Sequence, residues 1–352
     1  MTIAFIGHGY VGLVTAGVFA DLGNTVWVVG RTREKIEKLK KGIAPFYEPG
    51  LAELVSRNVR AGRLLFTLDY HEAVAASSII FICVGTPPKE SGEADLTSVY
   101  DAAESIGKNL VGYKVVVTKS TVPPGTNKKI GEILSKTKPE GASSFAIASV
   151  PEFLREGTAI SDTLHPDRIV IGTTSERARE LLLELHKPID GKTVLCNVET
   201  AELIKYASNS LLSTKISFAN AIAMLSERVG ADAEKVLEAV GLDRRLGRSF
   251  LYAGVGYGGS CFPKDVKALI ALAARYNYDF ALLKAVDDIN KAVGRHFVDK
   301  IIRHYSEKIK GTTIAILGLS FKPDTDDMRE APSIFVISEL LKHGVHIRAF
   351  DP

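Results

Sequence analysis

Short apolar runs alternate with amphipathic stretches over the first two hundred residues of the chain. The runs are rich in isoleucine and valine, and glycine, proline or polar clusters bound each of them, which indicates strands buried on both faces. We predict strands over residues 2–7, 25–29, 78–84, 114–119, 145–149 and 168–172, and helices over residues 11–22 and 32–41. Strands that alternate with helices favour an α/β fold with a Rossmann-like, doubly wound parallel sheet.

A long helical pattern begins at residue 200. Residues 200–229 contain no glycine or proline, and their apolar positions fall near helical spacing, which predicts one helix longer than usual. The apolar positions are Leu203, Tyr206, Ala207, Leu211, Ile216, Ala219, Ala223 and Leu225. Further helices are predicted over residues 233–240, 265–276 and 280–308, so residues 200–310 form a central helical segment.

The end of the chain returns to the α/β pattern. We predict a strand over residues 311–319, a helix over 333–343 and a second strand over 345–350. Two strands rarely form a stable sheet alone, so we expect the start of a second Rossmann-like domain that is incomplete in this sequence. The expected domains are a dinucleotide-binding domain (1–199), a helical domain (200–310) and the beginning of this C-terminal domain (311–352).

Composition and charge narrow the classes of function. The net charge of +3 is too small to favour nucleic-acid binding, and no stretch reaches the roughly 18 apolar residues of a membrane span. Cys83, Cys196 and Cys261 are an odd number at long spacings, which argues against a disulfide framework. Neither the cysteines nor the histidines show metal-ligand spacing, so we expect no metal. The first predicted strand begins almost at Met1, and we therefore expect no signal peptide and a cytoplasmic location.

The chain contains no glutamine. Depletion of thermolabile residues is a trend in proteins of thermophiles. Chance and genomic bias explain the same composition equally well, so a thermophilic source is one of two open interpretations.

The motif GHGYVG (7–12) lies between the first predicted strand and the first predicted helix. In such a motif Gly7 permits a tight turn, Gly9 lets the backbone approach a pyrophosphate, and Gly12 allows the helix to pack closely on the strand. The N-terminus of the helix then faces the phosphates. The motif in this context predicts a dinucleotide site, whereas His8 within it is interpreted as structural.

The end of the second predicted strand departs from the usual NAD pattern. Sites selective for NAD⁺ usually place an acid there to bind the ribose 2′-hydroxyl, but this chain has Gly30, followed by Arg31 and Thr32. Arg31 can bind a 2′-phosphate, with Thr32 as a hydrogen-bond donor. We therefore expect the dinucleotide site to accept NADP⁺, or even to prefer it to NAD⁺. The alternative is a solvated basic turn beside a site that tolerates NAD⁺ without the acid.

A second glycine-dense loop, GVGYGGSCFPKD, spans residues 254–265. Such a loop folds tightly and brings backbone close to a ligand. Cys261 lies in this loop near Lys264, just before a predicted helix. A helix N-terminus and a neighbouring cation both favour a thiolate, so we predict that Cys261 is a nucleophile, whereas Cys83 is interpreted as a core residue.

Several motifs in one order resemble those of the UDP-glucose/GDP-mannose dehydrogenase family. They are GHGYVG (7–12), VGTPP (84–88), KSTVPPGT (119–126), PEFLREGTA (151–159), Lys205 with Asn209, GYGGSCFPKD (256–265) and FKPDTDDMRE (321–330). Phe262 within them is similar to the UDP-glucose branch. The resemblance implies an NAD(P)-dependent double oxidation of a nucleotide sugar, UDP-glucose to UDP-glucuronate, through a thiohemiacetal and a thioester on Cys261.

The resemblance also implies roles for individual residues. The expected catalytic residues are Cys261, Lys205, Asn209, Asp265, Glu152 and Thr121. Lys205 and Asn209 would share one helix face and hold the substrate oxygen, Asp265 would act with a water, and Glu152 and Thr121 would serve thioester hydrolysis. The expected cofactor contacts are Gly7, Gly9, Tyr10, Val11, Gly12, Gly30, Arg31, Thr32, Lys35, Val84, Gly85, Thr86, Pro87, Ser120, Thr121, Glu156, Lys264 and Arg329. The expected substrate contacts are Phe153, Leu154, Arg155, Glu156, Lys205, Asn209, Arg245, Phe250, Leu251, Tyr252, Gly258, Phe321 and Lys322.

The resemblance further implies a homodimer that packs through the helix at 200–229, with Arg245 supplied by the neighbouring subunit; an internal core helix is the alternative. A family member would continue past Pro352 through most of its UDP-binding domain, and a longer chain and a short variant are both compatible with the sequence.

GDP-mannose and UDP-N-acetylhexosamines remain open as substrates. Two other classes are a β-hydroxyacid or 6-phosphogluconate type dehydrogenase and an NADP-sensing module without turnover. The Cys261 loop and the start of a third domain disfavour the first class, and the full set of Lys205, Asn209, Cys261 and Asp265 disfavours the second.

Overall fold

The computed structural model describes residues 1–142 and 144–352. The chain forms two compact units. Met1–Pro87 with Ala94–Lys205 make up the first unit, and Pro88–Glu93 with Tyr206–Pro352 make up the second. The three-domain division expected from the sequence stays a prediction. Within the described ranges, no helix is long and apolar enough to cross a membrane.

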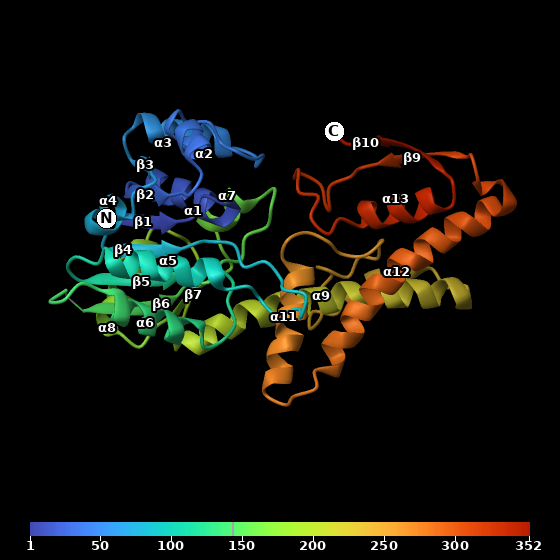
Figure 1. Cartoon of the computed structure of the whole chain (residues 1–352). Coiled ribbons are helices and arrows are strands. Elements are labelled where there is room, and N and C mark those ends of the chain that lie inside the picture. The colour runs from blue at the N-terminus through green and yellow to red at the C-terminus, as the bar shows by residue number, and fades with distance from the viewer. Residues whose placement is uncertain (143) are drawn as a thin grey trace. The chain divides into compact units, whose positions relative to one another are not determined.

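The first unit is built on an eight-stranded sheet in the order β3-β2-β1-β4-β5-β6-β7-β8 (Figure 1). Its strands are β1 (Thr2–Ile6), β2 (Thr25–Val29), β3 (Leu64–Thr67), β4 (Ile79–Ile82), β5 (Lys114–Thr118), β6 (Phe145–Ser149), β7 (Arg168–Gly172) and β8 (Lys192–Cys196). Every neighbouring pair is parallel except β6 and β7, which makes the sheet mixed at that single pairing. The segment between β6 and β7 therefore starts and ends at the edge where β1, β4 and β5 also end.

Helices cover both faces of this sheet, which confirms the doubly wound fold. They are α1 (Tyr10–Asp21), α2 (Arg33–Lys40), α3 (Leu51–Arg60), α4 (Tyr70–Ala76), α5 (Thr97–Lys108), α6 (Thr126–Thr137), α7 (Ala159–Leu164) and α8 (Glu176–His186). One apolar core joins the sheet to α1, α2, α3, α7 and α8, and a second joins it to α4, α5 and α6. Because successive side chains of a strand point to opposite faces, Ile3 and Phe5 enter the first core while Ala4 and Ile6 enter the second.

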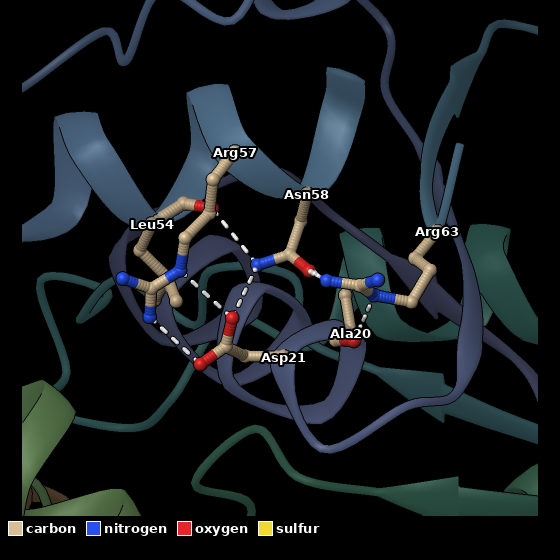
Figure 2. Close-up of polar contacts among 6 residues, drawn as sticks. All are labelled: Ala20, Asp21, Leu54, Arg57, Asn58 and Arg63. Atoms are coloured by element: carbon tan, nitrogen blue, oxygen red, sulfur yellow. Dashed lines mark hydrogen bonds and ion pairs between the residues drawn. The ribbon is translucent and has the colours of Figure 1, made fainter. Parts of the chain in front are cut away.

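A polar network fastens α3 to the end of α1 (Figure 2). Asp21 accepts hydrogen bonds from Arg57 at 2.8 and 2.7 Å and from Asn58 at 3.1 Å. The fully buried Asn58 also donates to the carbonyl of Leu54 at 2.9 Å and accepts two bonds from the Arg63 guanidinium at 3.1 and 2.9 Å. The hydrogen bonds from Arg57 lower the pKa of Asp21. The network holds the far end of the helix whose first turn carries the glycine motif.

The second unit is mainly helical. The helix α9 (Val198–Val229) begins in the first unit and continues here, followed by α10 (Ala233–Gly241), α11 (Phe262–Arg275), α12 (Ala281–Tyr305) and the 3₁₀ helix η1 (Ser306–Ile309). Tyr206, Val266 and Leu283 form an apolar core among α9, α11 and α12. The helix predicted to begin at residue 265 begins at Phe262, because Pro263 favours the first turn of a helix. Cys261 is therefore the N-cap residue of α11.

The predicted strand–helix–strand pattern at the end of the chain is confirmed. Strands β9 (Thr313–Leu317) and β10 (His346–Phe350) pair in parallel, and the helix α13 (Pro332–Lys342) lies between them in the chain (Figure 1). Val336 and Leu340 of α13 pack against Val298 of α12 in one apolar core.

Candidate active site

The glycine motif between β1 and α1 forms a tight turn whose backbone is open to a ligand. Gly7 has a φ of +117°, and a β-carbon there would lie 2.5 Å from the carbonyl oxygen of Cys83. A β-carbon at Gly12 would lie 2.3 Å from the carbonyl oxygen of Gly7. Apart from Gly9 itself, its chain neighbours and the backbone of its own helix, no atom of residues 1–142 and 144–352 lies within 4 Å of the β-carbon position at Gly9, the N-cap residue of α1. The motif thus has the geometry in which a phosphate can approach backbone and helix N-terminus.

Two loops follow β4 and β5 at the same edge of the sheet. Thr86 Oγ1 donates a hydrogen bond to the carbonyl of Thr121 at 3.0 Å, and Ser120 Oγ donates to the carbonyl of Val84 at 2.7 Å. These bonds hold four expected cofactor contacts in one rim. Ligands of open α/β sheets bind outside the carboxyl ends of the strands, so the rim extends the crevice of the glycine motif.

Four more expected cofactor contacts lie at the carboxyl end of β2, the neighbour of β1. The amide of Gly30 donates to the carbonyl of Thr67 at 3.1 Å. Arg31, Thr32 and Lys35 follow Gly30 and are exposed to solvent, with Thr32 as the N-cap residue of α2.

Glu152 and Lys205 form a buried ion pair. Nζ of Lys205 lies 2.8 Å from Oε1 of Glu152, and Oε2 accepts a hydrogen bond from the amide of Leu154 at 2.7 Å. Burial alone would raise the pKa of Glu152, but the Lys205 ammonium and the Leu154 amide outweigh burial and lower it. The ring of Phe153 lies 5.5 Å from Nζ of Lys205. Four residues expected in the site are therefore assembled around one carboxylate.

Lys119, which the sequence analysis missed, lies close to this ion pair. Burial lowers the pKa of Lys119, and the charges of Glu152 and Lys205 both act on it. Lys119, Glu152 and His186 line a small cavity of about 50 Å³, which is large enough for a water molecule. A lysine directly after an apolar strand was the available sequence signal.

Glu48, buried beside the glycine motif, was also missed. Its carboxylate accepts hydrogen bonds from the hydroxyl of Tyr10 and from the amides of Gly157 and Ala159 at 2.6 and 2.8 Å. Burial and the contact with Glu48 raise the pKa of Tyr10. One carboxylate thus fastens the glycine motif to the segment between β6 and β7, which carries Glu152.

Arg155, an expected substrate contact in that segment, is already paired. Its guanidinium donates to Asp162 at 3.0 and 2.6 Å, and its backbone amide donates to the same carboxylate at 2.9 Å. A substrate would have to share this guanidinium with Asp162.

In the second unit, the carboxylate of Asp265 contacts two of the other expected residues. Asn209 Nδ2 donates to its Oδ2 at 2.6 Å, and Nζ of Lys264 lies 2.5 Å from its Oδ1. Asp265 is fully buried in the first turn of α11. Asn209 and Lys205 lie one turn apart on α9, and each is bonded to a buried acid of its own unit.

Cys261 is exposed at the start of α11, with its Sγ 3.6 Å from Oγ of Ser260. A thiolate at an N-cap position faces the positive end of the helix dipole. The geometry therefore suits a nucleophile that a substrate can reach.

The glycines beside Cys261 let residues 321–330 approach the loop closely. A β-carbon at Gly258 would lie 2.2 Å from the carbonyl oxygen of Glu330, and one at Gly259 would lie 2.8 Å from the ring of Phe321. The amide of Gly259 donates to the carbonyl of Arg329 at 2.8 Å. The expected contacts Gly258, Phe321 and Arg329 are thus together.

Residues 245–252 carry another group of expected substrate contacts. Arg245 is exposed and pairs with Asp243 at 3.0 and 2.6 Å. Leu251 is buried, Tyr252 is exposed, and Phe250 has a φ of +66°. Arg245 therefore lies at the surface, paired with an acid two residues away in the chain.

The expected residues form two groups, and each group is assembled within its own unit. The first comprises the glycine motif, the rim after β4 and β5, the end of β2, and Glu152 with Lys205. The second comprises Asn209, Asp265, Lys264, the Cys261 loop, residues 245–252, whose Phe250 ring lies 6.2 Å from the ring of Phe262, and residues 321–330.

Models of one protein family match this chain in three consecutive segments. Residues 1–190 match the NAD binding domain of the UDP-glucose/GDP-mannose dehydrogenase family, residues 199–292 its central domain, and residues 315–352 its UDP binding domain.

Individual proteins match over nearly the whole chain. The UDP-glucose 6-dehydrogenase TuaD of Bacillus subtilis (strain 168) is 51% identical over 350 residues, which are 99% of this chain and 76% of that protein. A solved UDP-glucose dehydrogenase from the hyperthermophilic archaeon Pyrobaculum islandicum has a TM-score of 0.96 at 42% identity, covering 99% of this chain and 81% of that one. A solved GDP-mannose dehydrogenase from Pseudomonas aeruginosa has a TM-score of 0.69 at 34% identity, covering 100% and 81%.

Proposed function

The chain belongs to the UDP-glucose/GDP-mannose dehydrogenase family, and from this membership we propose that it is a UDP-glucose 6-dehydrogenase. The proposed reaction oxidises the C6 hydroxymethyl group of UDP-glucose to the carboxylate of UDP-glucuronate and reduces two dinucleotide molecules. High identity to proteins named for this activity supports the substrate.

One observation carries the proposal. The helix α9 holds a buried lysine and a buried amide one turn apart, and each is bonded to a buried acid. Burying charges is costly unless the groups are paired. Alcohol oxidation needs a cation and a hydrogen-bond donor beside the developing negative charge on oxygen, which Lys205 and Asn209 provide.

In the first oxidation, Lys205 and Asn209 bind the C6 oxygen and stabilise it as the hydroxyl proton leaves. Asp265 orients the water that takes this proton. A bound dinucleotide accepts one hydride in each oxidation. The glycine motif, with its open space beside Gly9, fits the pyrophosphate of that dinucleotide.

In the second oxidation, the Sγ of Cys261 forms a bond to the C6 aldehyde carbon, and the former carbonyl oxygen takes a proton. The product is a thiohemiacetal, which again carries a hydrogen that can leave as hydride. Loss of that hydride and of the hydroxyl proton gives a thioester. Glu152, with Thr121, then directs a water at the thioester carbonyl, the C–S bond breaks, and the thiol is restored.

The other contacts expected from the family resemblance complete this proposal. We propose that Phe153, Leu154, Arg155 and Glu156 contact the sugar nucleotide or the cofactor, and that Lys322 contacts the sugar nucleotide. A cytoplasmic location would keep the Cys261 thiol reduced.

For the cofactor, we propose that the enzyme accepts NADP⁺ as well as NAD⁺. Gly30 and Arg31 support this proposal because no carboxylate at the end of β2 repels a 2′-phosphate. Comparison of kcat/KM for the two cofactors tests it, and a large preference for NAD⁺ would refute it.

We also propose a homodimer through α9. The side chains of Leu211, Phe218 and Leu225 follow one another at seven-residue intervals on this helix and are 63%, 48% and 51% exposed. Such an apolar stripe is typical of a helix that packs on another copy. Light scattering should find a dimer for the native chain and a monomer for Leu211→Glu with Leu225→Glu. A monomeric native protein would also remove the role proposed for Arg245.

The decisive experiment counts reduced cofactor per substrate. Each UDP-glucose oxidised should yield two equivalents of reduced cofactor. The kcat/KM for UDP-glucose should exceed that for UDP-galactose, UDP-N-acetyl sugars and GDP-mannose. Cys261→Ser should stop at one equivalent or at an ester, while Cys196→Ser, which changes a cysteine of β8, should still give two. One equivalent from the native enzyme, or full turnover by Cys261→Ser, would overturn the thioester route.

A further inference from the structure

Two side chains crowd position 30 at the end of β2, where a site selective for NAD⁺ usually has an acid. A β-carbon at Gly30 would lie 2.5 Å from Cδ1 of Ile36 and 2.8 Å from Nδ1 of His8. Contacts this short require the neighbouring side chains to move. The imidazole of His8 and the side chain of Ile36 thus crowd the β-carbon position of the acid that would bind a ribose 2′-hydroxyl in a site selective for NAD⁺.

Positive charge gathers around the same point. Burial lowers the pKa of His8, and the charges of Lys35 and Arg31 lower it further, so both cations lie near the imidazole. Neither Arg31 nor Lys35 forms an ion pair with a residue of the described ranges, and Arg31 Nη2 reaches only the hydroxyl of Ser98 at 3.4 Å. The neighbouring acid, Glu34, is paired with Lys38 at 3.1 Å. Arg31 and Lys35 are thus two exposed cations beside the dinucleotide site, without an ion-pair partner among the described residues. Such a pair favours the binding of an anionic ligand.

Thr32 adds a donor to this group. It is the N-cap residue of α2, yet its side chain makes no capping hydrogen bond, which leaves the hydroxyl available. The N-terminus of α2 itself favours an anion.

From these contacts we infer that His8, Arg31, Thr32 and Lys35 form a binding site for the 2′-phosphate of NADP⁺, and that the enzyme prefers NADP⁺ to NAD⁺. A guanidinium and an ammonium neutralise a phosphate dianion, and the guanidinium can bind it through two hydrogen bonds. The preference for turnover rests on the proposed dehydrogenase activity, whereas the phosphate site itself does not.

Equilibrium binding tests the site without turnover. Dinucleotide fluorescence should show NADPH binding more tightly than NADH, and 2′,5′-ADP should displace NADPH better than AMP does. Arg31→Ala and Lys35→Ala should each weaken NADPH by about 10- to 100-fold, the range expected for charge-assisted hydrogen bonds, and leave NADH unchanged. Lys38→Ala, which changes a lysine of the same helix that is paired with Glu34, is the matched control. It should change neither the affinity for NADPH nor that for NADH. Equal losses for NADH and NADPH, or none, would overturn the site.

Space at position 30 gives a second test. Gly30→Asp should weaken both dinucleotides, because the carboxylate collides with His8 and Ile36. Gly30→Asp together with His8→Ala and Ile36→Ala removes the atoms that meet the new β-carbon and should restore the binding of NADH but not that of NADPH. Recovery of NADPH binding in this triple variant would contradict the inference.

The outcomes separate this inference from the proposed function. Tight NADPH binding that depends on Arg31, without oxidation of any nucleotide sugar, would sink the proposed activity and leave the site standing. Oxidation of UDP-glucose with a strong preference for NAD⁺ would support the proposed activity and refute the 2′-phosphate site.

Discussion

Nζ of Lys205 lies 2.8 Å from Oε1 of Glu152, and both side chains are more than nine-tenths buried. The carboxylate therefore stays ionised and holds the lysine on the side of α9 that also carries Asn209. In the proposed hydrolysis Glu152 accepts the proton of the water, and the ion pair with Lys205 makes the carboxylate a weaker base because it lowers the pKa of Glu152.

Removing one partner of this ion pair should cost more than removing both. Glu152→Ala leaves a buried ammonium without its carboxylate, and we expect a loss of about 3–5 kcal/mol in the free energy of unfolding. Glu152→Leu with Lys205→Met should be markedly more stable than Glu152→Ala, although both lack activity. Chemical denaturation with both variants makes the comparison. Equal stabilities would show that the pair contributes no mutual stabilisation.

The network in Figure 2 gives a second stability prediction. Asn58→Ala removes one hydrogen bond to Asp21 and two from Arg63, all made by a buried side chain, and each lost bond costs about 0.5–1.5 kcal/mol. Arg57→Ala removes an exposed ion pair with Asp21 and should cost about 1 kcal/mol or less. Thermal unfolding of both variants checks the order, and a larger loss for Arg57→Ala would contradict it.

Much of the fold follows from the pattern of apolar residues. The strands β2, β6 and β7 have the predicted bounds because both of their faces are buried and their apolar runs end at polar or glycine positions. The strands β3 and β8 were not predicted, although each contains a short apolar run, at residues 64–66 and 194–196. Four of the five residues of β8, an edge strand, are exposed, so this strand is not buried on both faces as the predicted strands are. The antiparallel pairing of β6 and β7 has no local signature, because strand direction depends on where the connecting segment returns.

The motifs identified the reacting side chains but not their partners. The pattern around Lys205 gives no sign that it pairs with Glu152, which lies in another part of the chain. Glu48 precedes Pro49 and Gly50 and looks like an ordinary turn residue. His8 was interpreted as structural, and only the contact with Gly30 shows how it shapes the end of β2. Contacts between distant segments depend on the tertiary fold, which local sequence does not encode.

Glu48 should position both the cofactor and the substrate segments. Tyr10→Phe removes only the bond between the glycine motif and Glu48, whereas Glu48→Gln disturbs that bond and both amide contacts. We expect Tyr10→Phe to raise the KM for dinucleotide about 10-fold at most, the equivalent of one hydrogen bond. Glu48→Gln should raise the KM for both dinucleotide and sugar nucleotide. Steady-state kinetics of the single and double variants tests this. Strictly additive effects on KM would show that Tyr10 and Glu48 do not act through each other.

The buried His186 should weaken the protein in mild acid. Burial, and then the charge of Lys119, lower the pKa of His186 to about 4, and its Nδ1 lies 2.8 Å from the carbonyl oxygen of Leu182. Between pH 6.5 and 4 the unfolded chain binds a proton that the native state does not, so the free energy of unfolding falls as the pH falls, by about 3 kcal/mol in total.

A variant without this imidazole isolates the effect. His186→Phe keeps a ring in edge contact with Phe19 and removes the titrating group, so its stability should fall less between pH 6.5 and 4 than that of the native protein. His71→Gln, which changes an exposed histidine, should follow the native curve. Urea denaturation at intervals of half a pH unit measures all three. The carboxylates titrate alike in each protein, so parallel curves for the native protein and His186→Phe would show that His186 is protonated in the native state.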